Sequence, residues 1–322
     1  MKGILKYFFK GRRINNNKVA NVNSIKNHII DKSIKTDKPV NKNTIVINEN
    51  KEEEYTPKES EMILGTVLGY GAHSTVYIAT DSSKNKYVCK KMKRSHRSNA
   101  LREIFILKKL KDNKYFPNYK FHIETKYNFM IFTEYNKAID LFEFVNRLID
   151  NGTLTDDIIK DVFLKMAKAI KELHNKGFNH LDIKMENFII LHNDTLDIKL
   201  IDFEMSYEHT KELKYIKRCI GTSGYSPLES YKHQYNYQTD IWSLGICLWM
   251  LLTNRMPFYH KSLIINDEMD VHFKLLPTPN EKKYIDKNAI ELVESILTID
   301  LNKRIELENI ITNKWLNEIK IK

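Results

Sequence analysis

Four polar side chains in the second half of the chain are of the types that could transfer a phosphoryl group. Asp182, Lys184 and Asn187 lie close together in the segment 180–187, and Asp202 follows a short apolar run. Transfer to a hydroxyl needs a carboxylate that orients the hydroxyl and accepts its proton, a cation near the moving group, and oxygen ligands for magnesium. Each loop alone would be read as structural, but their joint order predicts this chemistry.

A glycine-containing turn in the first half could hold the phosphates of the donor. Residues 68–76 read GxGxxS between two strand-like runs, and glycines let backbone N–H groups approach a triphosphate. Taken alone, the turn would be a plain hairpin turn. A dinucleotide-binding fold would need a helix directly after it, whereas residues 76–79 favour a strand.

A lysine and a glutamate beyond this turn could form a functional pair. Lys90 ends an apolar strand, and Glu103 lies in the helical run 101–110, so the carboxylate could hold the ammonium in place. Read singly, they would be a solvated strand-end lysine and a surface charge.

The elements that must position these groups change character along the chain. Residues 62–89 alternate short strand-like runs with turns, and beyond residue 140 apolar residues recur at helical spacing, as in 162–173 and 240–253. The pattern predicts an α+β domain over residues 59–320. We expect a β-rich N-lobe over about 59–135 and a mainly α C-lobe over about 136–320.

Residues 1–58 are expected to form a basic, Asn-rich, disordered leader, because they show no sustained period. The formal net charge of the chain is +11, and the first thirty residues carry seven lysines and arginines and no acid. No recognition motif accompanies the charge, so we expect no specific nucleic-acid partner. Apolar residues at 4–9 also allow a short membrane-surface helix, which would give weak peripheral membrane contact, and an unstructured leader is the alternative.

The cysteines and the apolar runs bear on the compartment. Cys89, Cys219 and Cys247 are odd in number and outside any CxxC spacing, which argues against a disulfide framework or a structural zinc site. We expect a reducing, cytoplasmic setting. The longest apolar run, 241–252, is too short to span a bilayer, so it predicts a buried helix.

Together these motifs resemble the eukaryotic protein-kinase family, over nearly everything after the leader. The resemblance implies the two-lobed protein-kinase fold and transfer of the γ-phosphoryl of ATP, with Mg²⁺ or Mn²⁺, to serine or threonine of a protein substrate. Lys184 favours serine and threonine over tyrosine. By the resemblance Asp182 is the catalytic base, Lys184 contacts the γ-phosphate, and Asn187 and Asp202 are the metal ligands.

The same resemblance implies the nucleotide site. Lys90 would contact the α and β phosphates with Glu103 positioning it, which adds both to the catalytic set. Glu134 and Asn136 would lie at the adenine-contacting hinge, and Asp140 near the ribose. The predicted nucleotide-binding residues are Leu68, Gly69, Tyr70, Gly71, Ala72, His73, Ser74, Val76, Lys90, Glu134, Asn136 and Asp140.

Further residues are implied to hold the machinery together. Residues 221–229 resemble the end of the activation segment, whose Glu229 would pair with Arg304, and Asp240 would brace the catalytic loop.

One departure from the family pattern concerns regulation. Leu181 replaces the usual arginine before the catalytic aspartate, and residues 215–220 contain no serine or threonine, with Arg218 close to the expected phosphate position. The arginine that would bind a phosphate and the serine or threonine that would carry it are both missing. We therefore predict that activation-loop phosphorylation of the common kind is not needed. A phosphosite at Thr210 or Tyr215 is the alternative.

Glu204 is the second departure, because it replaces the glycine after Asp202 and Phe203. A second carboxylate there could alter metal binding. The alternative to an active kinase is therefore a pseudokinase that acts as a nucleotide-binding or partner-binding scaffold.

Overall fold

The computed structural model describes residues 57–192, 195–217, 220–257 and 285–318. The chain has two compact units, 1–53 and 54–322, and the second is described by itself. All but two residues of the predicted leader, with its proposed membrane contact, lie outside the described residues, and so do Arg218 and Cys219.

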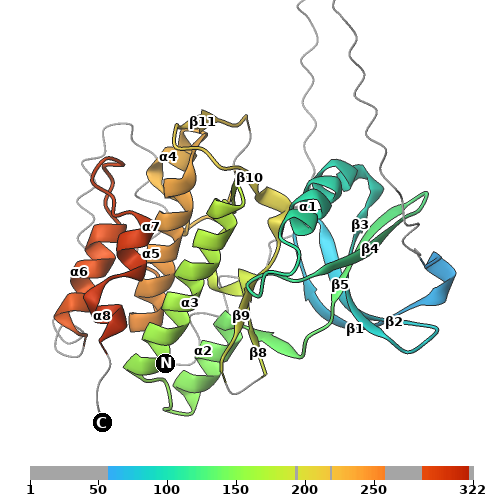
Figure 1. Ribbon diagram of the computed structural model, residues 1–322, viewed down its shortest axis with the longest axis horizontal. Coiled ribbons are helices and arrows are strands. Elements are labelled where there is room, and N and C mark those ends of the chain that lie inside the picture. Colours follow the sequence, from blue (N-terminus) through green and yellow to red (C-terminus); the bar gives the residue numbers. More distant parts are fainter. Residues whose placement is uncertain (1–56, 193–194, 218–219, 258–284, 319–322) are drawn as a thin grey trace, which may run out of the picture. The chain divides into compact units, whose positions relative to one another are not determined.

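The N-lobe is a five-stranded antiparallel sheet in the order β1-β2-β3-β5-β4 (Figure 1). The five strands are β1 Met62–Tyr70, β2 Ser74–Asp81, β3 Lys86–Lys93, β4 Tyr119–Glu124 and β5 Asn128–Glu134. Strand alternation sends the side chains of β5 to two different cores. Phe129 and Ile131 pack with helix α1, Arg97–Lys109, whereas Met130 and Phe132 pack on the opposite face of the sheet.

The C-lobe is built around α5, whose residues from Gln238 to Leu251 are all buried. A helix that is apolar on all sides must be surrounded by other elements. The α-helices of this lobe are α2 Leu141–Asp150, α3 Asp156–Asn175, α4 Leu228–Tyr231, α5 Tyr237–Thr253, α6 Lys287–Ile296, α7 Leu307–Ile311 and α8 Lys314–Asn317.

Short strands and 3-10 turns make up the rest of the regular structure in the described residues. A three-stranded sheet has the order β6-β8-β9, and two small ladders pair β7 with β10 and β11 with β12. These strands are β6 Ala138–Asp140, β7 Phe178–Asn179, β8 Phe188–Leu191, β9 Ile198–Leu200, β10 Tyr207–Glu208, β11 Lys214–Tyr215 and β12 Gln234–Tyr235. The 3-10 turns are η2 Glu59–Glu61, η3 Arg94–His96, η4 Met185–Asn187 and η5 Phe203–Met205.

The predicted α+β class with a β-rich N-lobe and a mainly α C-lobe is confirmed (Figure 1). The predicted helices at 101–110 and 240–253 and the buried strand at 129–132 are present as α1, α5 and β5. Within the described part of the chain, no helix is both long enough and apolar enough to cross a membrane.

Candidate active site

Asp182 lies at the centre of a compact polar network. Its Oδ1 accepts a hydrogen bond from the Thr222 hydroxyl at 2.6 Å, and its Oδ2 accepts one from Lys184 Nζ at 2.8 Å. Lys184 also donates to Thr222 Oγ1 at 2.9 Å, which closes a triangle of three side chains. The carboxylate is thus oriented from two sides and has a cation beside it, as proton acceptance next to a moving phosphoryl group requires.

The backbone of this loop is fixed from below by Asp240. This fully buried carboxylate accepts hydrogen bonds from the backbone N–H groups of His180 at 2.8 Å and Leu181 at 2.7 Å, and contacts His174 Nε2 at 2.9 Å. Leu181 has φ +64°, the left-handed region that a leucine rarely adopts. The predicted brace is therefore present, and it holds a strained backbone just before Asp182.

Asn187 and Asp202 lie close to this network. Asn187 Nδ2 donates to the backbone oxygen of Asp182 at 2.7 Å and to Asp182 Oδ2 at 3.2 Å. Asp202 has φ +68° and caps the turn η5. The remaining amide oxygen of Asn187 and the Asp202 carboxylate are hard oxygen donors of the kind that Mg²⁺ prefers.

Lys90 joins the two lobes. Its Nζ lies 2.8 Å from Glu103 Oε2 of α1 and 2.6 Å from Asp202 Oδ1, and the lysine side chain is 12% exposed. The pair expected from the sequence is therefore present, and Asp202 is a second anionic partner. A lysine held in this way presents a fixed positive charge at the junction of the lobes.

The ionisation of these groups is coupled. Burial alone lowers the pKa of Lys90, but the charges of Asp202 and Glu103 outweigh it and raise that pKa. Burial likewise works to raise the pKa of Asp202, yet Lys90 lowers it to about 2. Burial raises the pKa of Glu103 despite the neighbouring ammonium. Asp202 therefore remains ionised at neutral pH and is able to bind a metal ion.

The glycine turn lies between β1 and β2. It is closed by the Gly71 N–H, which donates to the Ser74 carbonyl at 2.9 Å. A Cβ at Gly69 would meet nothing within 4 Å, and the φ of Gly69 lies outside the positive range. Nothing in the described chain therefore requires glycine at position 69, which is the pattern expected where a ligand approaches the backbone closely.

The other residues of this segment fall into two groups. Leu68, Tyr70, Ala72 and His73 are exposed. Val76 is directly opposite Lys90 in the β2–β3 register, so both side chains point to the same face of the sheet.

The three predicted hinge and ribose residues are engaged in different ways. The Glu134 side chain lies 2.8 Å from Lys199 Nζ, so a nucleotide contact at this position would be left to the main chain. Burial works to raise the pKa of Glu134, but the Lys199 contact lowers it. Asn136 is half-buried between β5 and β6, and Asp140 caps α2 by accepting the Glu143 N–H at 2.8 Å.

Glu204 is buried, and its carboxylate has partners of its own. Asn99 Nδ2 of α1 donates to Oε1 at 2.9 Å, and Lys90 Nζ lies 3.9 Å from Oε2. The extra carboxylate therefore adds a third negative charge around Lys90, beside those of Glu103 and Asp202.

The segment that follows is tied down by apolar contacts. Leu181 packs with Ile220 and Tyr235, and all three are at most 3% exposed. The Tyr235 hydroxyl also accepts the Ile220 N–H at 2.9 Å and donates to the Ser230 carbonyl. The side chain at the usual arginine position is thus part of an apolar cluster.

The expected pair at the end of this segment is present. Arg304 Nη1 lies 2.7 Å from Glu229 Oε1, and the Arg304 side chain is fully buried. Such a pair is costly to break, because either partner alone would be a buried charge.

Three residues at the site were missed, or given no contact, in the sequence reasoning. Thr222 was placed in the end of the activation segment without a contact, although it bonds both Asp182 and Lys184. Asn99 and His96 were not singled out, because Glu204, which lies near both, is distant from them in the sequence and leaves no local pattern.

Comparison with known proteins agrees with the resemblance that the sequence motifs indicated. The family model described as "Protein kinase domain" matches residues 62–316. Calcium-dependent protein kinase 9 of Arabidopsis thaliana is 28% identical over 269 residues, which are 79% of this chain and 48% of that protein. Calcium-dependent protein kinase 2 of Zea mays is 26% identical over 279 residues, 82% of this chain and 52% of that protein.

A relative from a third organism is similar to a comparable share of the chain. The probable serine/threonine-protein kinase fhkE of Dictyostelium discoideum is 29% identical over 275 residues, 80% of this chain and 38% of that protein. The chain thus spans about half the length, or less, of these curated relatives.

Proposed function

Because this chain belongs to the protein kinase domain family, we propose that it is an active serine/threonine kinase that transfers the γ-phosphoryl of ATP to protein hydroxyls. The observation that carries the proposal is the Asp182 network. Its carboxylate is within hydrogen-bond distance of Lys184 and Thr222, so a proton acceptor and a cation are held together.

In the proposed reaction, Asp182 orients the substrate hydroxyl and accepts its proton as the γ-phosphoryl moves to the oxygen. Lys184 offsets the negative charge on the phosphoryl group, and Lys90 holds the α and β phosphates. Mg²⁺ would neutralise phosphate charge, and Asp202 and Asn187 would hold it. Proton transfer, charge neutralisation and alignment are then divided among residues fixed by Asp240 and Glu103.

Two features of the site fit a bound ATP with magnesium. The Gly69 backbone is open to a ligand, and Asp202 is ionised at neutral pH with a pKa of about 2. The oxygens of Asp202 and Asn187 and the absence of a crowding side chain at Gly69 match a magnesium-bound triphosphate.

The first test is phosphate incorporation from MgATP into a peptide library with serine, threonine and tyrosine acceptors, using the full chain. We expect incorporation into serine and threonine peptides and little into tyrosine peptides. Asp182→Ala serves as the silent control. Equal silence of the wild type and this variant would contradict the enzyme and favour the pseudokinase scaffold, and dominant tyrosine incorporation would contradict the specificity alone.

A second test addresses the Lys90–Glu103 pair. Glu103→Gln keeps a hydrogen-bond acceptor near Lys90 but removes a charge that lies 2.8 Å from the ammonium. Asp202 and Glu204 would then attract Lys90 without the opposing charge of Glu103, so we expect the lysine to leave the phosphates and the KM for ATP to rise about tenfold, about 1.4 kcal/mol. Steady-state kinetics with varied ATP measures this.

The matched control is Glu291→Gln, the same change at an exposed carboxylate of α6. Its KM for ATP is expected to stay within about twofold of the wild-type value, as an exposed pair contributes little. An equal KM in Glu103→Gln and the wild type would remove Glu103 from the proposed positioning role.

A further inference from the structure

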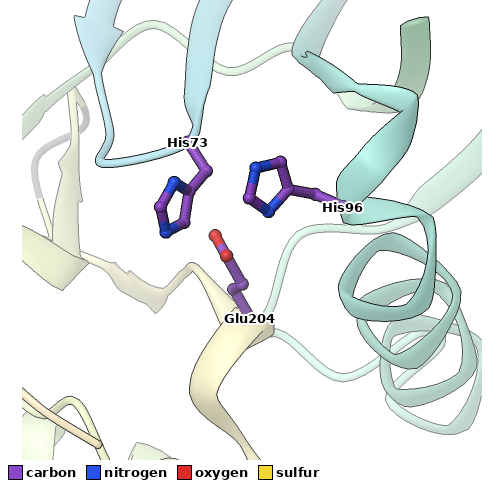
Figure 2. Close-up of side chains that lie close together, drawn as sticks. All are labelled: His73, His96 and Glu204. Carbon is purple, nitrogen blue, oxygen red and sulfur yellow. The ribbon is translucent and has the colours of Figure 1, made fainter. Parts of the chain in front are cut away.

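Two histidines and a glutamate from distant parts of the chain meet beside the glycine turn. His73 lies at the tip of the turn between β1 and β2, His96 ends η3, and Glu204 lies in η5. One ligand atom from each can be chosen so that the three lie within 4.8 Å of one another. Figure 2 shows the Glu204 carboxylate pointing toward the space between the two imidazole rings.

The donor set has a definite chemical preference. Two imidazole nitrogens and one carboxylate oxygen are the ligands of open, three-residue zinc sites, which keep a fourth position for water. Magnesium and calcium prefer oxygen ligands alone, so this set differs from that of Asp202 and Asn187. A transition-metal ion of the zinc class is thus the matching ligand.

The distances allow such an ion after a small movement. Tetrahedral ligands at about 2.1 Å from zinc lie about 3.4 Å apart, so donors that lie within 4.8 Å must approach one another by up to about 1.4 Å. The His73 and His96 rings are stacked with centroids 4.3 Å apart, so they are already neighbours. His73 is exposed on a turn that contains Gly71, and it is therefore the ligand that is free to move.

The other two ligands are held in place. Asn99 Nδ2 donates to Glu204 Oε1 at 2.9 Å, the kind of outer contact that orients a ligating carboxylate. The turn that carries His96 is anchored by the Arg94 N–H, which donates to the Tyr127 carbonyl at 2.9 Å.

Charge also favours a cation at this place. Three carboxylates, those of Glu103, Asp202 and Glu204, surround the single ammonium of Lys90. Glu204 is 8% exposed, and the Lys90 ammonium, which lies 3.9 Å from its Oε2, is bonded to the other two acids. A buried carboxylate that lacks a close cation of its own is stabilised by binding one.

We propose that His73, His96 and Glu204 form a binding site for one Zn²⁺ ion, separate from the proposed magnesium ligands. Bound Zn²⁺ would fasten the tip of the glycine turn to η3 and η5. If the turn covers ATP, as proposed above, this would slow nucleotide exchange, and Zn²⁺ would inhibit phosphoryl transfer. The inhibition rests on the proposed function, whereas the binding does not.

Binding is tested by calorimetric titration of the full chain with Zn²⁺ in excess Mg²⁺, which occupies oxygen sites. The key variant is His96→Phe, which keeps an aromatic ring to stack on His73 but has no donor nitrogen. We expect one ion to bind the wild type in the micromolar range or tighter, and at least tenfold more weakly to the variant. Co²⁺ in place of Zn²⁺ should give the visible absorption of a tetrahedral site in the wild type only.

His192→Phe is the matched control, because it makes the same change at an exposed histidine outside the cluster. Its Zn²⁺ affinity should stay within about twofold of the wild-type value. Equal Zn²⁺ binding by His96→Phe and the wild type, or no binding by either, would overturn the site. Circular dichroism and the melting temperature of His96→Phe show whether it folds, and Glu204→Gln provides a second variant that lacks a ligand.

The consequence is measured separately as inhibition of the kinase by Zn²⁺, with each protein compared with its own zinc-free rate. We expect inhibition of the wild type at concentrations that fill the calorimetric site, its reversal by a chelator, and at least tenfold higher concentrations for the same inhibition of His96→Phe. Binding without such inhibition would contradict the regulatory consequence and leave the metal site standing. A protein that binds Zn²⁺ but transfers no phosphate would contradict only the proposed function.

Discussion

Replacing Asp182 with asparagine is expected to lower kcat about 1,000-fold, within the range for loss of a general base. The asparagine keeps the shape of the side chain and can still accept the Thr222 hydroxyl, but its amide cannot accept the substrate proton and would place a donor against Lys184 or Asn187. The loss corresponds to about 4 kcal/mol of barrier. Single-turnover rates at saturating MgATP measure it free of product release.

Nucleotide affinity separates this effect from misfolding. Asp182 is not one of the proposed nucleotide contacts, so the Kd for MgATP should change by no more than about threefold. Asp150→Asn, at the exposed end of α2, is the matched control and should retain the wild-type rate. Less than tenfold loss of kcat in Asp182→Asn would contradict its role as the base, and a lost nucleotide affinity would place the damage in the site as a whole.

The sequence was sufficient for contacts that the family pattern fixes. Glu103 meets Lys90, Glu229 meets Arg304, and Asp240 accepts the N–H groups that precede Asp182. In each case the residue type and its order along the chain are linked to a position in a common fold. Both lobes could also be predicted, because the spacing of apolar residues in strands and helices directly reflects which side chains are buried.

The directions of individual side chains could not be predicted from the sequence in the same way. Glu134 was expected at the hinge, but its carboxylate turns to Lys199, and the sequence held no signal for that choice. The left-handed backbone of Leu181 could not be predicted either, because leucine rarely adopts a positive φ. Glu204 departs from the family pattern, so that pattern could not predict its contact with Asn99.

Leu181 occupies the position of an arginine in the family pattern, and the contacts it makes there could not be predicted. The sequence showed that the arginine was absent but not what filled its place. The ladder between β11 and β12 brings Tyr235 to Leu181 and Ile220, and the three side chains exclude water together. An apolar cluster holds its shape without an added charge, so the segment can be ordered without the phosphate that an arginine would bind.

Leu181→Ala is therefore expected to destabilise the protein by about 3 kcal/mol, because it removes a buried leucine side chain and leaves a cavity. Alanine adopts the same φ at little extra cost, so the loss reports packing. Urea denaturation measures it. Because the cluster orders the segment that carries Thr222, the kcat of the folded variant should fall at least tenfold. Ile299→Ala, at an exposed position, should change stability by less than about 0.5 kcal/mol.

The same cluster predicts that phosphatase treatment leaves the wild-type rate within about twofold. Removing phosphate from Thr210 or Tyr215 would leave the buried contacts of Leu181 and Ile220 intact, since Tyr215 is exposed and lies outside the cluster. Bacterially expressed protein is assayed before and after exhaustive treatment, with mass spectrometry of the peptide 202–229. A rate that falls tenfold or more, about 1.4 kcal/mol of barrier, in step with one phosphorylated residue of that peptide would show that charge orders the segment. If folded Leu181→Ala has the same kcat as the wild type, the apolar cluster does not order the segment that carries Thr222.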